Sequence, residues 1–144
     1  SRWVVANRGD LRGPQGLPIW KPPYSRIVAI DMNTGDHLWA IPNGDTPDTI
    51  RDHPALKGVN IPNTGQQSHP VMVATKTLLI TAPGGTDAVL HALDKKTGKR
   101  LATVKLPAPG QYGMMTYLHE GQQYIVVQVM GRNHPGSLAA LRLP

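Results

Sequence analysis

The side chains with the most obvious chemical potential are six histidines and a group of aspartates. The histidines have no paired spacing such as His-x3-His, which gives little support to a transition-metal site. Asp45, Asp48 and Asp52 lie close enough in sequence to suggest calcium, but their spacing does not resemble a calcium loop. We therefore expect these aspartates to be solvated. No glycine pattern typical of phosphate binding is present, and Gly84-Gly85 is expected to form a turn.

The basic residues give a net charge of +6, which favours anionic partners in a general way. They are scattered through turns, and the only cluster is formed by Lys95, Lys96, Lys99 and Arg100. A solvated hairpin tip explains this cluster better than a nucleic-acid surface, because few stacking aromatic residues accompany it. We therefore expect no nucleic-acid partner, and a nucleic-acid binder is the weakest of the functions considered.

The composition indicates a folded chain of short strands. A length of 144 residues suits one domain, and 40% hydrophobic against 17% charged residues is too apolar for a disordered chain. The 15 Gly and 14 Pro residues interrupt long helices and suit tight turns. The absence of Cys excludes disulfides and thiolate metal sites. No run approaches the roughly 20 apolar residues of a membrane helix, and no export signal is visible. We therefore expect neither a membrane-spanning helix nor a signal peptide in these residues.

Hydrophobic periodicity predicts an all-β, antiparallel chain. The predicted strands cover residues 3–6, 26–30, 36–41, 71–74, 77–81, 89–93, 100–105, 114–118, 123–129 and 139–143. An irregular stretch from Pro42 to Gln67 separates the early strands from the later ones, with one helical turn predicted at Pro54–Lys57. Because long ordered loops tend to be functional, we expect a role for this stretch.

An eleven-residue segment recurs after 63 residues and is the most informative feature of the sequence. Residues 29–39 read AIDMNTGDHLW, and residues 92–102 read ALDKKTGKRLA. Each copy predicts a strand, a turn and a strand, because its aspartate can accept turn amides and its glycine can supply a positive φ. The turn residues are Asp31 and Gly35 in the first copy and Asp94 and Gly98 in the second.

A single hairpin of this kind cannot bury its apolar face, whereas stacked copies can, as in propellers and solenoids. Trp39 is expected between neighbouring sheets, with its ring buried and its N–H on a carbonyl oxygen. The second copy has Ala102 at the equivalent position. The alternative is two coincidental hairpins in a β-sandwich, and the eleven matched positions favour the repeat.

Several segments, in a fixed order, resemble the C-terminal part of the dehydrogenases that depend on pyrroloquinoline quinone (PQQ), especially the membrane glucose dehydrogenase branch. The longest is GLPIWKPPYSRIVAID at residues 16–31, and the others lie at 56–62, 75–79, 106–108, 115–117 and 123–127. The spacing of Ala29, Asp31, Gly35 and Trp39 is similar to the tryptophan-docking motif of that family. The resemblance extends from about residue 16 to the end of the chain.

The resemblance implies an eight-bladed β-propeller of four-stranded antiparallel sheets, facing the periplasm, with PQQ and calcium or another divalent cation over its channel. It implies oxidation of a sugar or other alcohol by hydride transfer to the quinone, and a quinone or cytochrome as electron acceptor. Residues 1–144 would supply the end of one blade, a full blade at about 68–106 and most of another at about 110–144. The alternative is a non-catalytic propeller scaffold related to outer-membrane assembly proteins.

This division implies that the chain alone is an incomplete, inactive part of such an enzyme. The alternative is a short chain that closes its exposed sheet edges against other copies or other chains. The remaining blades, the catalytic base, the ligands of the cation and any anchor to the inner membrane would all lie in other regions. No catalytic residue and no metal ligand is therefore assigned to this chain.

The resemblance also points to cofactor-binding residues in the loop before residue 71. PQQ carries three carboxylates and an orthoquinone, which require basic groups and amide donors. We expect contacts from Thr64, Ser68 and His69. Some relatives have Trp near the position of Ser68, so the resemblance does not extend to the stacking contact that they use. A solvated loop imidazole is the alternative for His69.

A second group of cofactor-binding residues is expected in the turn after residue 129, where the family has a Gly-Gly-Arg or Gly-Gly-His turn. Arg132 matches the basic position and Gly131 matches one glycine, whereas Met130 departs from the pair. Arg132 is the expected partner of a carboxylate or of the quinone, with Asn133 beside it and His134 as a fallback. An exposed turn arginine is the alternative.

Overall fold

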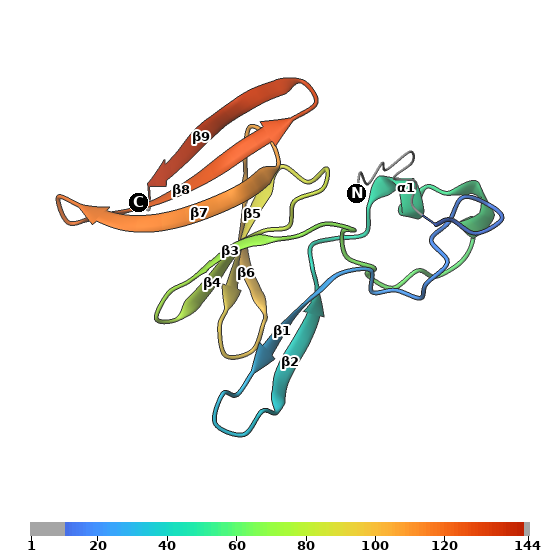
Figure 1. The fold of residues 1–144 in the computed structure, drawn as a ribbon, viewed down its shortest axis with the longest axis horizontal. Coiled ribbons are helices and arrows are strands. Elements are labelled where there is room, and N and C mark those ends of the chain that lie inside the picture. The colour runs from blue at the N-terminus through green and yellow to red at the C-terminus, as the bar shows by residue number, and fades with distance from the viewer. Residues whose placement is uncertain (1–10, 143–144) are drawn as a thin grey trace, which may run out of the picture.

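The computed structural model describes residues 11–142 as three antiparallel sheets (Figure 1). The first sheet is β1 (Arg26–Ile30) and β2 (His37–Pro42); the second is β3 (Val71–Ala74), β4 (Leu78–Ala82), β5 (Val89–Asp94) and β6 (Arg100–Lys105); the third is β7 (Gly110–His119), β8 (Gln122–Gly131) and β9 (His134–Arg142). Every sheet keeps its strands in sequence order. The predicted all-β, antiparallel class is confirmed.

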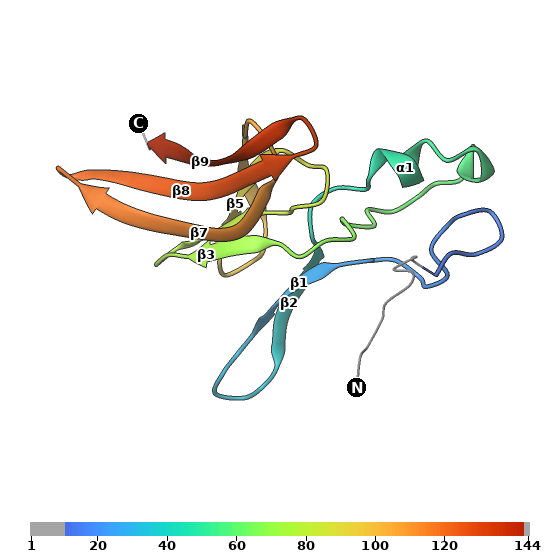
Figure 2. The ribbon, with the colours of Figure 1, turned by 45° about the horizontal axis from the view of Figure 1, so that its top comes forward.

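The long stretch between β2 and β3 contains α1 (Asp48–Arg51) and a 3₁₀ turn at Pro54–Leu56. The 3₁₀ turn confirms the predicted helical turn, whereas α1 was not predicted because four residues are too few for a helical period to show. Figures 1 and 2 show this stretch projecting away from the three sheets. Within residues 11–142 no helix is long and apolar enough to cross a bilayer.

Most strands begin within a residue or two of their predicted starts, and the exceptions have local causes. β7 starts at Gly110 instead of residue 114, because an irregularity in its pairing between Gly110 and Met114 interrupts the alternation of side chains. β9 starts at His134 instead of residue 139, since Pro135 and Gly136 are weak strand formers. The strand predicted at residues 3–6 lies outside the described residues.

The two copies of the repeated segment form equivalent hairpins, β1–β2 and β5–β6. Both hairpins shift register at the same place, beside Ala29 in the first and Ala92 in the second. The turn aspartates Asp31 and Asp94 each accept a hydrogen bond on Oδ1 from the backbone N–H two residues ahead, at 2.8 and 3.0 Å. The glycines of the two turns have φ values of +79° and +72°. The repeat is therefore structural, as predicted.

Trp39 joins the first sheet to the second, as predicted, although its ring is only partly buried. Its Nε1–H donates to the backbone carbonyl of Lys95 at 3.1 Å. Its ring lies on Gly98, where an added Cβ would stand 2.8 Å from Trp39 Cε3. Glycine is thus favoured at position 98 for two reasons: the backbone has a positive φ, and a side chain would collide with the Trp39 ring.

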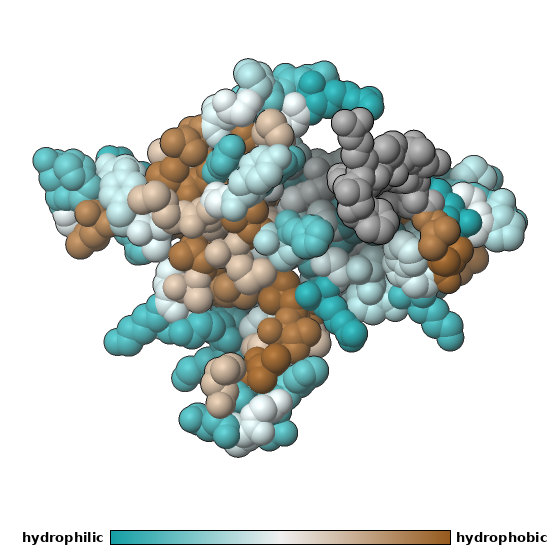
Figure 3. All heavy atoms as spheres, viewed as in Figure 1, coloured by the Kyte–Doolittle hydropathy of each residue, from teal (hydrophilic) through white to brown (hydrophobic). Residues whose placement is uncertain are grey.

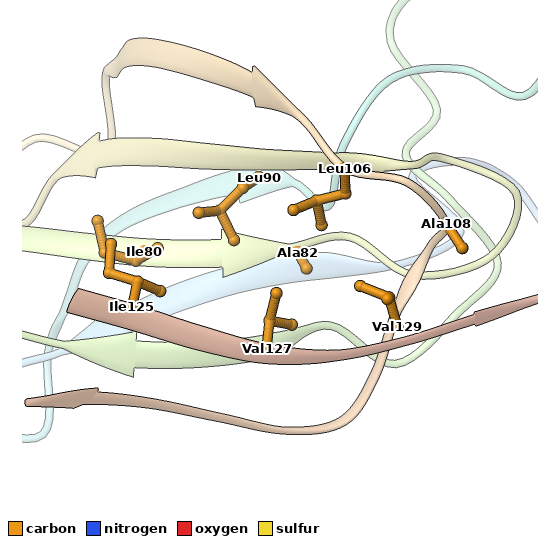
Figure 4. Close-up of a cluster of buried hydrophobic side chains, with 8 residues drawn as sticks. All are labelled: Ile80, Ala82, Leu90, Leu106, Ala108, Ile125, Val127 and Val129. Atoms are coloured by element: carbon orange, nitrogen blue, oxygen red, sulfur yellow. The ribbon is translucent and has the colours of Figure 1, made fainter. Parts of the chain in front are cut away.

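The two central strands of the four-stranded sheet, β4 and β5, are largely buried, and adjacent residues of each strand point to opposite faces. Leu79 faces the first sheet and packs with Ile27, Leu93, Trp39 and Ile41. Ile80 faces the third sheet, in the larger cluster shown in Figure 4. That cluster contains Ile80, Ala82, Leu90, Leu106, Ala108, Ile125, Val127 and Val129. The sheets are therefore stacked face to face.

The outer face of the third sheet is apolar and is not covered by the described residues. Met115 and Leu138 on this face are 54% and 72% exposed. Together with Val126 and the backbone around Gly113 they line a shallow apolar groove. Figure 3 shows hydrophobic residues at the surface around this sheet and around the β1–β2 hairpin. Both outer sheets thus present surfaces suited to packing against further sheets.

Candidate functional site

Four loops of the second and third sheets meet at one end of their strands. In a sheet of sequential antiparallel strands every second connection falls at the same end, so the loop before the first strand lies beside the loop between the second and third. The loops are those before β3, between β4 and β5, before β7, and between β8 and β9. They line two adjoining hollows, and Gly85 and Gln111 contribute to both.

The first hollow lies between the starts of β3 and β7 and has a volume of about 770 Å³. Ser68 and His69 form one side of it, and Gln111 and Tyr112 form another. Four glycines also line it: Gly84, Gly85, Gly110 and Gly113. Of these four, only Gly113 has open space where a side chain would stand, and Gly84 and Gly110 are buried.

Three of these glycines are fixed by their surroundings. Gly84 and Gly85 have φ values of +76° and +65°, and an added Cβ would lie 3.0 Å from the His69 carbonyl oxygen or 2.9 Å from Gln66 Oε1. Gly110 has an ordinary φ, but an added Cβ would stand 2.5 Å from the Cβ of Ala82. The sequence pattern predicted a turn at Gly84-Gly85 but gave no sign that it lines a hollow.

The second hollow has a volume of about 720 Å³ and lies between the β4–β5 loop and the β8–β9 turn. Arg132 and Asn133 are the two residues of that turn, since Gly131 pairs with His134 across it. Both side chains are exposed and line the hollow, which gives it a guanidinium group. Gln111 Nε2–H donates to the Met130 carbonyl at 3.3 Å and ties the starts of β7 and this turn together.

The predicted cofactor-binding residues fall into three positions. Ser68 and His69 line the first hollow, and Arg132 and Asn133 line the second. Thr64 lines neither hollow: it is 1% exposed, and its Oγ1–H donates to the Gly65 carbonyl at 3.2 Å. The structure therefore brings four of the five predicted residues to the hollows and leaves Thr64 inside the supporting loop.

A buried asparagine that sequence reasoning missed supports the first hollow. Asn43 is fully buried, and its Nδ2–H groups donate to the carbonyls of Pro83, at 3.0 Å, and Ser68, at 3.4 Å. Ser68 Oγ–H donates to the same Pro83 carbonyl at 2.7 Å. The loop before β3 and the β4–β5 loop are thus held together from behind. Only the Asn43-Gly44 dipeptide, a turn signal, could have drawn attention to this position.

Gln66 makes a second link between loops. Its Nε2–H groups donate to the Asp45 carbonyl at 3.0 Å and to Asp87 Oδ2 at 2.8 Å. Burial raises the pKa of the Asp87 carboxyl above its ordinary value, although the hydrogen bond from Gln66 opposes this shift.

Asp45 remains 55% exposed, in keeping with the solvated loop aspartates that were predicted, but it also forms an ion pair that the prediction missed. Its carboxylate makes a bidentate pair with Arg100 at 2.9 and 3.0 Å, and these hydrogen bonds lower the pKa of Asp45. Asp48 also pairs, with Arg51 at 2.9 Å. Fifty-five residues separate Asp45 from Arg100, and no local pattern could reveal their contact. Among the described residues, His, Asp and Glu do not cluster in groups of three or more that could hold a metal ion.

A smaller cavity of about 180 Å³ lies between the first and second sheets. His91 lines it, with Nδ1 at 2.9 Å from Thr103 Oγ1 and with Nε2 lacking a hydrogen-bond partner among the described residues. Thr81 Oγ1 is buried and unpartnered in the same way. Burial, followed by the charge of Arg100, lowers the pKa of His91, so the imidazole is neutral at neutral pH.

The stacked antiparallel sheets, docked through a tryptophan and carrying loops from two sheets at one end, define this chain as part of a β-propeller. Residues 2–125 match the family model described as "PQQ: Glucose/ethanol/alcohol dehydrogenase, beta-propeller domain". The chain belongs to this family, and the resemblance found in the sequence is confirmed.

Named relatives agree with the family match. The chain is 31% identical over 133 residues to a probable quinate dehydrogenase (quinone) of Xanthomonas campestris pv. juglandis, an alignment that covers 88% of the chain and 16% of the relative. It is 30% identical over 139 residues to quinoprotein glucose dehydrogenase A of Acinetobacter calcoaceticus, covering 91% and 17%. It is 32% identical over 128 residues to the quinoprotein glucose dehydrogenase of Escherichia coli (strain K12), covering 86% and 15%. The chain thus spans about a sixth of the length of these relatives.

Proposed function

We propose that this chain is the C-terminal part of the propeller of a PQQ-dependent dehydrogenase that oxidises a CH–OH group of a sugar or another alcohol. The match of residues 2–125 to the dehydrogenase propeller family carries this proposal. The match to dehydrogenases also favours an enzyme over a non-catalytic propeller scaffold. When bound, PQQ supplies an orthoquinone that accepts the hydride removed from the alcohol carbon.

The chemistry of the two hollows fits PQQ. Its three carboxylates require cationic and N–H donors, and Arg132 offers a guanidinium fork at the second hollow. Each hollow is large enough for a ligand of cofactor size. In this proposal Arg132 and Asn133 hold a carboxylate or quinone oxygen, and Ser68 and His69 line the opposite side of the rim.

We further propose that the three sheets are parts of three successive blades: the end of one, a complete one, and most of a third in an eight-bladed ring. The apolar outer face of β7–β9 supports this arrangement, because Met115 and Leu138 would be buried by a neighbouring blade. Other regions of the protein would provide the remaining blades, the base and the ligands of calcium or another divalent cation. The proposal also includes a quinone or cytochrome acceptor and a periplasmic location, with an anchor to the inner membrane.

The first experiment is reconstitution of the full-length apoprotein with PQQ and calcium, followed by dye reduction with glucose, quinate and glycerol. Quenching of protein fluorescence during PQQ titration measures binding independently of turnover. We expect saturable PQQ binding and oxidation of at least one of these alcohols. Failure to bind PQQ would overturn the cofactor assignment, and binding without oxidation of any alcohol would overturn the proposed reaction.

The second experiment tests Arg132 with the variant Arg132→Ala in the full-length protein. Loss of one charge-assisted contact should raise the Kd for PQQ at least about tenfold, since such hydrogen bonds contribute about 1.5–3 kcal/mol. Arg142→Ala is the matched control, because Arg142 lies at the other end of β9, about 26 Å along the strand. Arg132→Lys should recover part of the affinity but not the bidentate geometry. An unchanged PQQ titration for Arg132→Ala would remove this residue from the site.

A further inference from the structure

Tyr112 has a backbone conformation that is unusual for a bulky residue. Within residues 11–142, two non-glycine residues have a positive φ: Tyr112 at +63° and Glu120 at +50°. Glu120 precedes Gly121 in the tight turn between β7 and β8, where such a φ is ordinary. Tyr112 lies instead in the irregular start of β7, and a bulky side chain in this region of φ is strained.

Neither packing nor hydrogen bonding within the described residues accounts for this strain. The Tyr112 side chain is 77% exposed, and it makes no hydrogen bond or ring contact with another described residue. Glycine would occupy this φ without strain, and the next residue, Gly113, shows that small residues are accepted in the segment. The ring is therefore placed where a molecule outside the described residues can use it.

Tyr112 lines the first hollow together with both polar and apolar residues. Met72 and Met114 are among the other apolar residues that line it. Ser68 and His69 provide polar groups that face the same space. A wall of this kind suits a ligand that has an apolar C–H face and hydroxyl groups at its edge. Sugars and cyclitols have that pattern, whereas short linear alcohols have no ring face to lie on an aromatic side chain.

We propose that Tyr112 is a specificity-determining residue that contacts the non-reacting face of a cyclic polyol substrate. The inference rests on the proposed dehydrogenase function and names its substrate class. The aromatic ring lies against the C–H face of the substrate, while polar groups of the hollow take its hydroxyls. Because the ring contacts the substrate away from the carbon that loses hydride, it contributes to binding equally in the ground and transition states. Its removal therefore raises KM and leaves kcat nearly unchanged.

The test compares three variants of the full-length, PQQ-loaded protein. Tyr112→Ala and Tyr112→Gly should raise KM for glucose or quinate between about twofold and about twelvefold, the range expected for one aromatic contact. KM for 1-butanol should not change. Tyr112→Phe keeps the ring and should retain the KM of the wild type. In addition, Tyr112→Gly relieves the strained φ, so its thermal midpoint should be no lower than that of the wild type.

Glu120→Gly is the matched control, because it also replaces a positive-φ residue but lies at the far end of β7. It should leave every KM unchanged. In Tyr112→Ala and Tyr112→Gly, a rise in KM for glucose or quinate but not for 1-butanol, with normal PQQ binding, would support the proposal. An unchanged KM for cyclic polyols, or equal rises for cyclic polyols and 1-butanol, would overturn it. A raised Kd for PQQ in Tyr112→Gly would also overturn it and make Tyr112 a cofactor contact. These outcomes differ from failure of the proposed function, in which the wild type itself would bind no PQQ or oxidise no alcohol.

Discussion

The contact between Gly110 and Ala82 sets how closely the third sheet approaches the second at the first hollow. Ala82 is fully buried in β4, and a Cβ added to Gly110 would stand 2.5 Å from its Cβ and 3.2 Å from Val127 Cγ2. Carbon atoms in contact are normally about 3.5–4.0 Å apart, so Gly110→Ala forces the two strands apart by about 1 Å. The φ of Gly110 is ordinary, and the clash is therefore the dominant effect of the substitution.

We expect Gly110→Ala to destabilise the packing of these sheets by about 1–3 kcal/mol, the usual cost of overpacking a core. Ala82→Gly alone should cost about 1–2 kcal/mol through one lost buried methyl group and a more flexible strand. The double variant moves a methyl group from one strand to the other and relieves the clash. Its loss should therefore be smaller than the sum of the single losses by at least about 1 kcal/mol.

Amide hydrogen exchange read by mass spectrometry is the suitable assay, because it reports local opening in a large protein. Peptides from β4, β7 and β8 of the full-length protein should exchange faster in Gly110→Ala and recover protection in the double variant. Peptides from the β1–β2 hairpin serve as an internal control and should not change. Additive losses, with a coupling below about 0.5 kcal/mol, would refute the predicted contact between the two strands.

Three further predictions concern the links between the first and second sheets. Gly98→Ala should be more destabilising than Gly35→Ala in thermal unfolding, because both glycines have a positive φ but only Gly98 lies under the ring of Trp39; equal losses would contradict this packing. The lowered pKa of His91 means that the unfolded chain takes up the proton at a higher pH than the folded chain does, so stability should fall as the pH drops below about 6.5. His91→Asn should flatten this pH dependence, measured by hydrogen exchange of β5. Because the pKa of Asp45 is lowered in the folded chain, its ionised carboxylate stabilises the fold at pH values above the ordinary pKa of 3.8. This stabilisation is lost as the pH falls below that value. Asp45→Asn should therefore lower stability at neutral pH by at most about 1 kcal/mol, because the carboxylate is 55% exposed, and a loss that persisted at pH 2.5 would contradict the ion pair.

The features that the sequence predicted well are those with a local cause. The turn at Asp31 and Gly35 follows from one side chain that accepts amides and one residue that tolerates a positive φ, and both signals lie within five positions. The docking of Trp39 was predictable because an indole that packs between sheets usually places its N–H on an acceptor. The repeat added the information that such hairpins stack.

The features that the sequence did not predict depend on residues that are distant along the chain. Asn43 holds two loops at positions 68 and 83, and Arg100 reaches back to Asp45. The first hollow forms because two glycine-containing loops of different sheets meet, and each loop alone predicts only a turn. The start of β7 was missed because its irregular pairing removes the alternation on which strand prediction depends.

The tryptophan link between sheets has a consequence for how such chains can diverge. Trp39 contacts a main-chain oxygen at position 95 and a bare backbone at Gly98, so it recognises nothing that distinguishes one residue type from another at position 95. Mutations of the lysine at that position leave the acceptor in place, provided that the glycine survives. Hairpins of different composition can therefore serve as partners for the same indole. Duplication or exchange of these hairpins would preserve the contact between sheets, while the loops at the other end of the strands are free to acquire new specificities.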